Sequence, residues 1–515
     1  MRTSPLPLLL LLLTSCGDSK SARSPEAGSG IDLAVTDLAV TDRAMPDRAL
    51  PDSNVADAHV ADAHAADLAD VVPSDGPQTD APPAPPTAAP RPRPPSTADV
   101  AAASGLRWRR GLIHMHSVHS HDACDGNPKP DGQYDQQCLA DLRFAICNAR
   151  LDYLLLTDHP DSFDDVTFDE AVLFDSTLGD VLIKDDGGAT IGNVAACPDG
   201  TTVLIAPGCE SDLMPVLLRR RPDDPSFYGQ RTVEGVLGLK AAGALVLQAH
   251  TEERTFEELD PIGLDGIEIY NLHANVNPRW HQLAEVLPDI SRLLDARDRG
   301  PHPDLFMLAI LRENRWAIET WNRLVTTRTM LGHAGSDIHQ NLPPLVVPSD
   351  GERLDSYRRF TTWFANYLLV DAASAFDLDV VREALATGRN LVVFHLLGEP
   401  DGFDFSGRGQ DGLRIEMGAE RSFEAGLTLR VNVPKSVPAA ELDVRLLQIV
   451  DDGEGVQSVV VAQGSSDFSY AVERPGVYRV EVHQTPIHLA PELGILADLL
   501  VRPTPWIYSN PIYVR

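Results

Sequence analysis

The sequence predicts an α/β domain followed by a small antiparallel β-sandwich, and three observations lead to this prediction. Between residues 104 and 402, apolar runs typical of strands alternate with helical patterns, as they do in β/α barrels. Several of these runs end in His, Asp or Glu. From residue 403 to 515 the helical patterns give way to short segments with alternating apolar residues, which is typical of antiparallel strands.

Residues 1–16 have the features of a secretory signal. An early arginine precedes a leucine-rich stretch that is too short to span a bilayer, and Cys16 follows directly after Leu13-Thr14-Ser15. This ending resembles bacterial lipoprotein signals, in which the cysteine becomes the lipidated first residue of the mature chain. The resemblance implies an exported lipoprotein, anchored to a membrane through Cys16 and located in the periplasm or at the cell surface. An ordinary cleaved signal peptide is the alternative.

Residues 17–103 are expected to form a disordered tether. They are rich in Ala, Asp and Pro and contain almost no aromatic residues, so they cannot bury enough apolar surface to offset the entropy of ordering. As a flexible coil, this segment has a root-mean-square reach of about 50 Å.

The region 104–402 has the alternating pattern of a β/α domain. Strand-like runs occupy 151–159, 202–210, 244–250, 264–271 and 330–339. Helical patterns occupy 139–150, 232–243, 280–287 and 314–328, and a last helix and strand fall within 377–395. In the C-terminal region, the predicted strands occupy 427–435, 443–450, 456–463 and 476–484.

Potential metal ligands stand at the ends of the predicted strands. His114 and His116 form one pair with i, i+2 spacing, and Asp337 and His339 form another far along the chain. Such pairs suit strands that present both side chains to one face. Further candidates follow apolar runs or polar loops between them: Asp122, Asp158, His159, Glu210 and His250. One such residue alone is ordinarily a cap or a hydrogen-bonding group, but the joint pattern predicts a metal centre.

These blocks resemble the PHP (polymerase and histidinol phosphatase) family of metallohydrolases. The family's HxH, TDH, lone Glu, strand-end His and GSDxH blocks read HMH, TDH, GCE, QAH and GSDIH here, in the same order, over roughly residues 108–395. The resemblance implies a distorted, seven-stranded β/α barrel with metal ions at the carboxyl ends of the strands. That position agrees with the general location of barrel active sites.

The resemblance also implies how the ligands are shared between ions. One ion would be bound by His114, His116, Glu210 and Asp337, and a second by Asp122, His159 and His339. Glu210 would hold a metal-bridging hydroxide and reach toward a third ion near His250. Many relatives have a further histidine between Glu210 and His250, but 211–249 contains none. Two ions are therefore expected, and a third depends on a substitute ligand such as Asp212, Asn271 or His273.

Imidazole and carboxylate ligands without a set of thiolates suit Zn²⁺, Mn²⁺ or Fe²⁺. Two divalent ions facing three carboxylates would leave a positive pocket for an oxyanion. A water whose pKa falls toward about 7 could then attack phosphorus or a carbonyl carbon. Candidates for acid or base catalysis at the leaving group are His273, His121 and His119, although solvated loop histidines are an equal alternative.

Three functions are consistent with these patterns. The first is a metal-dependent hydrolase, foremost a phosphoesterase for small phosphorylated molecules outside the cytoplasm. The second is a hydrolase of carboxyl or carbamate esters, because the closing PWIYSNPIYVR resembles the tail of exported, carbaryl-hydrolase-type proteins. The third is a noncatalytic surface binding module stabilised by metals. Binding to nucleic acid is not expected, because the net charge is −32 and repels phosphate backbones.

Five cysteines remain besides Cys16, and export permits disulfides between them. Cys124 and Cys138 flank the polar segment after Asp122, so a bridge between them would hold the metal-site loop. Cys197 with Cys209 is a second option. The odd number leaves at least one thiol unpaired or intermolecular.

Overall fold

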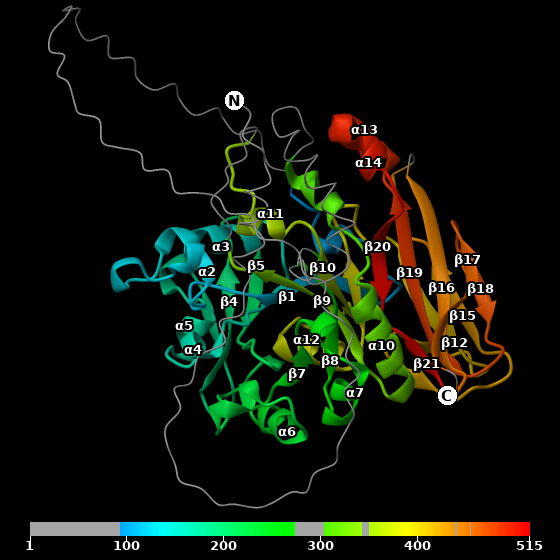
Figure 1. Ribbon diagram of the computed structural model, residues 1–515, viewed down its shortest axis with the longest axis horizontal. Helices are drawn as coiled ribbons and strands as arrows, with labels where there is room; N and C mark the ends of the chain where they lie inside the picture. The colour runs from blue at the N-terminus through cyan, green and yellow to red at the C-terminus, as the bar shows by residue number, and fades with distance from the viewer. Residues whose placement is uncertain (1–92, 273–274, 276–302, 342–349, 438–439, 454) are drawn as a thin grey trace, which may run out of the picture. The chain divides into compact units, whose positions relative to one another are not determined.

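The computed structural model describes residues 93–272, 275, 303–341, 350–437, 440–453 and 455–515. They form a mixed α/β structure with one large mixed sheet and a separate four-stranded antiparallel sheet (Figure 1). The predicted α/β class is therefore confirmed, and the C-terminal strands are compatible with a β-sandwich. Cys16, His273 and the helix expected at 280–287 lie outside the described residues. Within those residues, no helix combines the length and apolar character needed to cross a membrane.

Six parallel strands form the centre of the large sheet. They are β1 (Leu106–Met115), β2 (Tyr153–Leu155), β5 (Thr202–Ala206), β7 (Leu245–Gln248), β8 (Gly266–Asn271) and β9 (Leu331–Ile338). Parallel pairing joins β7 to β8, β8 to β9, β9 to β1, β1 to β2 and β2 to β5. Their largely buried, apolar sequences fit strands that are covered on both faces. Because these strands run in the same direction, their carboxyl ends lie at one edge.

Antiparallel strands extend this centre. They are β3 (Val181–Lys184), β4 (Thr190–Ala196), β6 (Met214–Val216), β10 (Ala365–Asp371) and β11 (Asn390–Val393). β4 pairs with β3 and β5, β6 with β7, and β10 with β1 and β11. Two backbone hydrogen bonds also link the segment after β5 to the surroundings of β6, from Cys209 N–H to the Pro215 carbonyl and from Leu218 N–H to the Pro207 carbonyl, each 3.0 Å.

The longer helices coincide with the helical patterns of the sequence. They are α3 (Gln136–Asn148), α6 (Val233–Ala241), α10 (Arg315–Thr327) and α12 (Leu378–Ala386). The side chain of the residue before each helix accepts a hydrogen bond from a backbone N–H of the first turn, which stabilises the start of a helix. The short helices are α2 (Ala123–Gly126), α4 (Pro160–Phe163), α5 (Phe168–Ala171), α7 (Phe256–Leu259), α11 (Tyr357–Phe360), α13 (Ala490–Leu493) and α14 (Ala497–Leu500).

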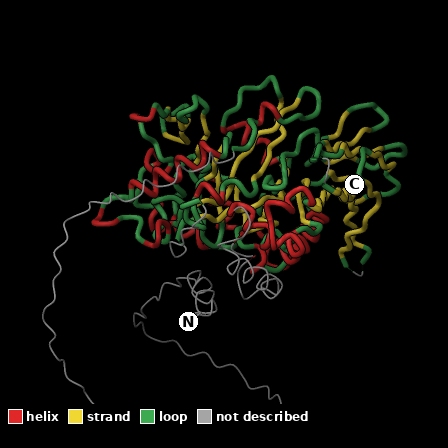
Figure 2. Tube along the Cα trace, turned by 90° about the horizontal axis from the view of Figure 1, so that it is seen from above, coloured by secondary structure: helices red, strands yellow, loops and turns green. Residues whose placement is uncertain are grey.

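The C-terminal strands are divided between the two sheets. The separate sheet has the order β13 (Arg414–Ile415), β12 (Asp404–Arg408), β15 (Thr428–Asn432) and β18 (Phe468–Ala471). The large sheet contains β14 (Glu420–Arg421), β16 (Glu441–Asp451), β17 (Val456–Gly464), β19 (Gly476–Thr485), β20 (Thr504–Ser509) and β21 (Ile512–Val514). Figure 2 shows the C-terminus among these strands. β20 pairs with both β11 and β19, so the α/β part and the C-terminal region share one sheet.

Residues 93–103, expected at the end of the tether, contact the α/β part. Arg93 donates a hydrogen bond to the Cys147 carbonyl at 2.9 Å, and Thr97 donates one to the Asp152 carboxylate at 2.8 Å. Packed structure therefore begins before residue 104.

Two disulfides are present among the described residues. Cys124 is bonded to Cys138, at the loop after Asp122. Cys197 is bonded to Cys147 and not to Cys209, which is a buried free thiol. The reason is spatial: the Cα atoms of Cys147 and Cys197 lie 5.6 Å apart, a distance that a disulfide spans.

Candidate metal centre

The predicted ligands gather at the carboxyl ends of the parallel strands. His114 and Asp337 lie in the last residues of β1 and β9, and His116 and His339 follow these strands. His159, Glu210 and His250 come after β2, β5 and β7. Eight of the nine candidates, Asp122 among them, fall into three groups in which the ligand atoms lie within 4.8 Å of one another, and Asp158 belongs to none of the groups. Side chains that are far apart in the sequence thus converge on one place.

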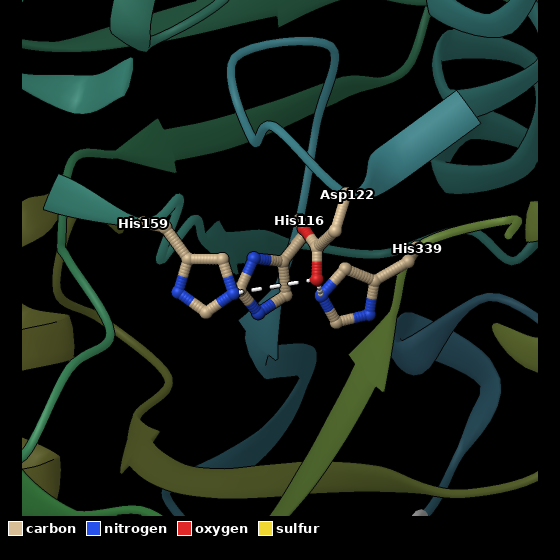
Figure 3. Close-up of side chains that lie close together, drawn as sticks. All are labelled: His116, Asp122, His159 and His339. Atoms are coloured by element: carbon tan, nitrogen blue, oxygen red, sulfur yellow. Dashed lines mark ion pairs between the residues drawn. The ribbon is translucent and has the colours of Figure 1, made fainter. Parts of the chain in front are cut away.

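The first group consists of His116, Asp122, His159 and His339 (Figure 3). Asp122 Oδ2 lies 3.2 Å from His339 Nε2 and 3.5 Å from His159 Nε2. These three residues are the set expected for the second ion. His116, expected at the first ion, also lies against this group, because its ring stacks on that of His339 with 3.8 Å between centroids.

The other two groups are His114, His116 and Asp337, and His114, Glu210 and His250. Asp337 Oδ1 lies 3.2 Å from His114 Nε2 and 3.5 Å from His116 Nε2, and Asp337 Oδ2 lies 3.5 Å from His250 Nε2. Glu210 Oε1 lies 3.4 Å from His250 Nε2, and Glu210 Oε2 lies 3.0 Å from His159 Nδ1. Glu210 and Asp337 therefore contact histidines of more than one group.

The substitutes considered for a third ion are engaged elsewhere or not described. The Asp212 carboxylate pairs with Arg231 at 2.5 Å. The Asn271 amide donates a hydrogen bond to Glu268 Oε2 at 3.0 Å. His273 lies outside the described residues. The group of His114, Glu210 and His250 forms without any of them.

Three of the candidate ligands have a left-handed backbone. The φ angles of His114, His250 and Asp337 are 63°, 50° and 50°, which are uncommon for residues other than glycine and cost about 1–3 kcal/mol each. The register between β1 and β9 also shifts between Ile113 and Met115. The i, i+2 pairs therefore reach the site through irregular strand ends, and not through the regular pleat that the sequence suggested. Backbone strain of this kind clusters at functional sites.

Glu268, in the middle of β8, is a site residue that the sequence analysis missed. Its Oε1 lies 2.6 Å from His114 Nδ1, and its Oε2 accepts a hydrogen bond from His250 N–H at 2.8 Å. A carboxylate on one ring nitrogen of a metal-binding histidine orients the ring and leaves the other nitrogen for the ion. The signal available in the sequence was an acidic residue inside the apolar run GIEIYN.

Other buried groups position the loops of the site. Asp158 accepts hydrogen bonds from Ser117 N–H at 2.6 Å and from Ser117 Oγ at 2.8 Å, so it joins the loops after β1 and β2. The Tyr357 hydroxyl donates to the His116 carbonyl at 3.0 Å. His116 Nδ1 lies 2.9 Å from Ser120 Oγ. These contacts hold His116 with Nε2 directed toward Asp337.

The electrostatics of the site suit cations. Burial lowers the pKa of His114, but Asp337 and Glu268 outweigh it and raise the pKa to about 10. Burial raises the pKa of Glu210, yet contacts with His159 and His250 bring it well below its usual value. The buried Nε2 atoms of His114 and His116 make no hydrogen bond within the described part of the chain. Unsatisfied imidazole nitrogens beside ionised carboxylates fit Zn²⁺, Mn²⁺ or Fe²⁺, so these groups can hold metal ions.

The histidines proposed for proton transfer differ in position. His119 is buried, with Nε2 3.0 Å from the Glu170 carbonyl, so it holds a loop. His121 packs its ring against that of His159, with 5.1 Å between centroids, and its side chain is 43% exposed. Of the three candidates for proton transfer, the structure describes His119 and His121. Between these two, His121 is the one at the solvent edge of the site.

Comparison with known proteins gives no match to this chain. No family model matches the sequence, and neither a curated protein nor a solved structure matches it.

Gly335 leaves the space that the Glu268 carboxylate occupies. A Cβ atom at this position would lie 1.7 Å from Glu268 Oε1 and 3.1 Å from His114 Nδ1. We expect Gly335→Ala to displace Glu268 and His114 and to weaken metal binding at least about tenfold, as loss of an outer-shell contact does. Competition with a chelator measures the affinity. Gly229→Ala is the control, because nothing lies within 4 Å of a Cβ there, and an equal affinity in both variants would contradict the prediction.

The two disulfides are expected to have different roles. They enclose sequence separations of 14 and 50 residues. For loops of these lengths, chain entropy predicts that removing the disulfide lowers the free energy of unfolding by about 3 and about 4 kcal/mol. Replacing Cys147 and Cys197 by serine should therefore lower the free energy of unfolding more than replacing Cys124 and Cys138 does. Replacing Cys124 and Cys138 should weaken metal binding more, because Asp122 precedes this bridge and Cys124 N–H donates to the His339 carbonyl. Urea unfolding and metal titration of both pairs test this, and the reverse order of metal affinities would refute it.

Proposed function

We propose that the protein is a metal-dependent hydrolase of the PHP type, foremost a phosphoesterase for small phosphorylated molecules. One observation carries the proposal: eight His, Asp and Glu side chains from five strand ends and the loop after β1 form overlapping ligand groups. A structural zinc site is closed by four protein ligands. Here Glu210 and Asp337 each contact histidines of two groups, which suits neighbouring ions that clamp a substrate during an in-line displacement.

The seven-stranded barrel of such a hydrolase is part of the proposal. The two hydrogen bonds between the segment after β5 and the surroundings of β6 support closure, since β6 pairs with β7. The path then runs through β7, β8 and β9 to β1, and through β2 back to β5. A closed ring would hold the ligands at fixed distances.

The charge of the site supports a third ion. Glu268 and Glu252 join Asp122, Glu210 and Asp337, which makes five carboxylates in contact with candidate ligand residues. Two divalent ions would leave these five groups with a net charge of −1, so the positive pocket expected from three carboxylates would vanish. A third ion held by His114, Glu210 and His250 would restore a net positive charge, and phosphate oxyanions would then be attracted.

Each residue has a definite task in the proposed reaction. Bound divalent ions would lower the pKa of a water toward about 7 and stabilise charge on the phosphoryl oxygens. The carboxylates of Glu210 and Asp337 lie between neighbouring ligand groups, and the Glu268 carboxylate orients the ring of His114. His121, beside His159 at the solvent edge, would give a proton to the leaving group. The signal-like segment ending at Cys16 adds the proposal that this chemistry takes place outside the cytoplasm.

The test is metal content and turnover of the purified full-length protein. Chelated protein is refilled with Zn²⁺, Mn²⁺ or Fe²⁺ and assayed on an aryl phosphomonoester, a phosphodiester, a carboxyl ester and a carbamate. We expect chelation to abolish turnover, metal to restore it, and phosphoesters to react faster than the other esters. Faster carbamate hydrolysis would favour the alternative hydrolase. Bound metal without any turnover would favour the noncatalytic module, and absence of bound metal would refute all three.

A further inference from the structure

Glu252 is a buried carboxylate beside the ring of His250. It lies in the short 3₁₀ turn Thr251–Glu253 that follows β7. Its side chain is 3% exposed, and its Oε1 lies 3.4 Å from His250 Nδ1. The other ring nitrogen of His250, Nε2, lies 3.4 Å from Glu210 Oε1 and 3.5 Å from Asp337 Oδ2. The two nitrogens of this ring therefore face different carboxylates, and Glu252 lies beside the one that the ligand residues do not contact.

The surroundings of Glu252 give its charge little other compensation. Within the described residues, its one ion pair is with His250, and its buried Oε2 accepts no hydrogen bond. A buried carboxylate with so few partners is costly. The next residue differs, because the Glu253 side chain is 28% exposed and lies 3.8 Å from Arg254. The group that can gain from the costly charge of Glu252 is the ring of His250.

The ring of His114 is held in a similar way. Its Nδ1 lies 2.6 Å from Glu268 Oε1, and its Nε2 lies 3.2 Å from Asp337 Oδ1. The rings of His114 and His250 lie edge to face, with 5.5 Å between centroids, and both belong to the ligand group that contains Glu210. In each histidine of this group, a carboxylate from outside the group lies beside Nδ1 and leaves Nε2 for an ion.

We propose that Glu252 is the positioning residue of the third ion, because it orients the ring of His250 with Nε2 toward Glu210. The inference rests on the proposed hydrolase, since it names the residue on which the third ion of that centre depends. A carboxylate beside one nitrogen of a ligating histidine fixes the proton there, orients the ring and makes the other nitrogen a more basic ligand.

The third ion is the one that should respond to Glu252. His114, Glu210 and His250 supply three ligand atoms, one fewer than the four of a closed zinc site, so the loss of one oriented ring is not made good by the others. His250 belongs to neither of the other two ligand groups. A change at Glu252 should therefore weaken one ion and leave the other two in place.

Counting bound ions tests the proposal in the full-length protein. Chelator-treated protein is dialysed to equilibrium against buffers of fixed free Zn²⁺, and the unaltered protein should bind three ions. Glu252→Gln keeps the size of the side chain and removes its charge. It should lower the affinity for one ion about 10–100-fold, the usual effect of an outer-shell change, and leave the other two affinities unchanged. Glu252→Asp keeps the charge on a shorter side chain, so its affinity for that ion should lie between those of Glu252→Gln and the unaltered protein.

The matched control is Glu253→Gln, which removes a neighbouring charge that contacts Arg254, and it should bind all three ions as the unaltered protein does. Equal affinities in Glu252→Gln and the unaltered protein would overturn the proposal. An equal loss of all three ions would also overturn it, because it would show a general structural role. Two ions in the unaltered protein would overturn this inference alone, since the hydrolase needs only the first two. Three ions without turnover would refute the hydrolase and leave the role of Glu252 intact.

Discussion

Asp337→Asn is expected to lower turnover by more than about 100-fold while the protein keeps its fold. The substitution preserves the shape of the side chain and removes the charge that lies 3.2 Å from His114 Nε2 and 3.5 Å from His250 Nε2. Changes to outer-shell residues of a metal site lower metal affinity or activity about 10–100-fold. Loss of a ligand that contacts two groups should therefore lower turnover further. The measurements are turnover at saturating metal, metal content and urea unfolding.

The matched control for this variant is Asp186→Asn, which changes an exposed aspartate in the turn between β3 and β4. Its turnover should equal that of the unaltered protein. If Asp337→Asn kept its turnover, the proposed catalytic centre would be wrong. If the variant unfolded before it lost turnover, the metals would have a structural role, as the noncatalytic hypothesis holds.

Glu268→Gln is expected to weaken metal binding by about 10–100-fold, the usual effect of removing an outer-shell carboxylate. The amide keeps the size of the side chain and loses the charge beside His114 Nδ1 and the acceptor of His250 N–H. The ring of His114 would then lose its fixed orientation toward Asp337. Metal titration of the chelated protein measures the change, and turnover at saturating metal should recover in part.

Glu234→Gln, on the exposed side of α6, is the control for this experiment. A Glu268→Gln variant with unchanged metal affinity would show that Glu268 serves the packing of the strands and not the ligands. Partial recovery of turnover at high metal concentration would identify Glu268 as a positioning residue. The turnover lost in Asp337→Asn should not recover with excess metal.

Helices and strands with strong local patterns followed the sequence closely. The run 314–328 predicted α10, and the structure has it at Arg315–Thr327 with Asn314 as its cap. The C-terminal runs 443–450 and 476–484 fall within β16 and β19. Apolar periodicity and capping act over a few residues, so neighbours along the chain were enough for these predictions.

Partners that meet only in space were harder to predict. The pairing of Cys197 with Cys147 depends on the distance between the end of α3 and the end of β4. Glu268 appeared to be one residue of a buried strand, because nothing near it in the sequence shows that His114 and His250 lie beside it. The left-handed backbone of His114 and Asp337 also has no local sign, since glycine is the usual residue for it.

The order of residues along the chain was sufficient to name the eight ligand candidates and their chemistry, because side-chain type and spacing are local properties. Which of them lie in one ligand group, and which carboxylate contacts His114 and His250, followed from the folded chain. These properties depend on distances between segments far apart in sequence, and such distances are set by how the strands pair and how their ends meet.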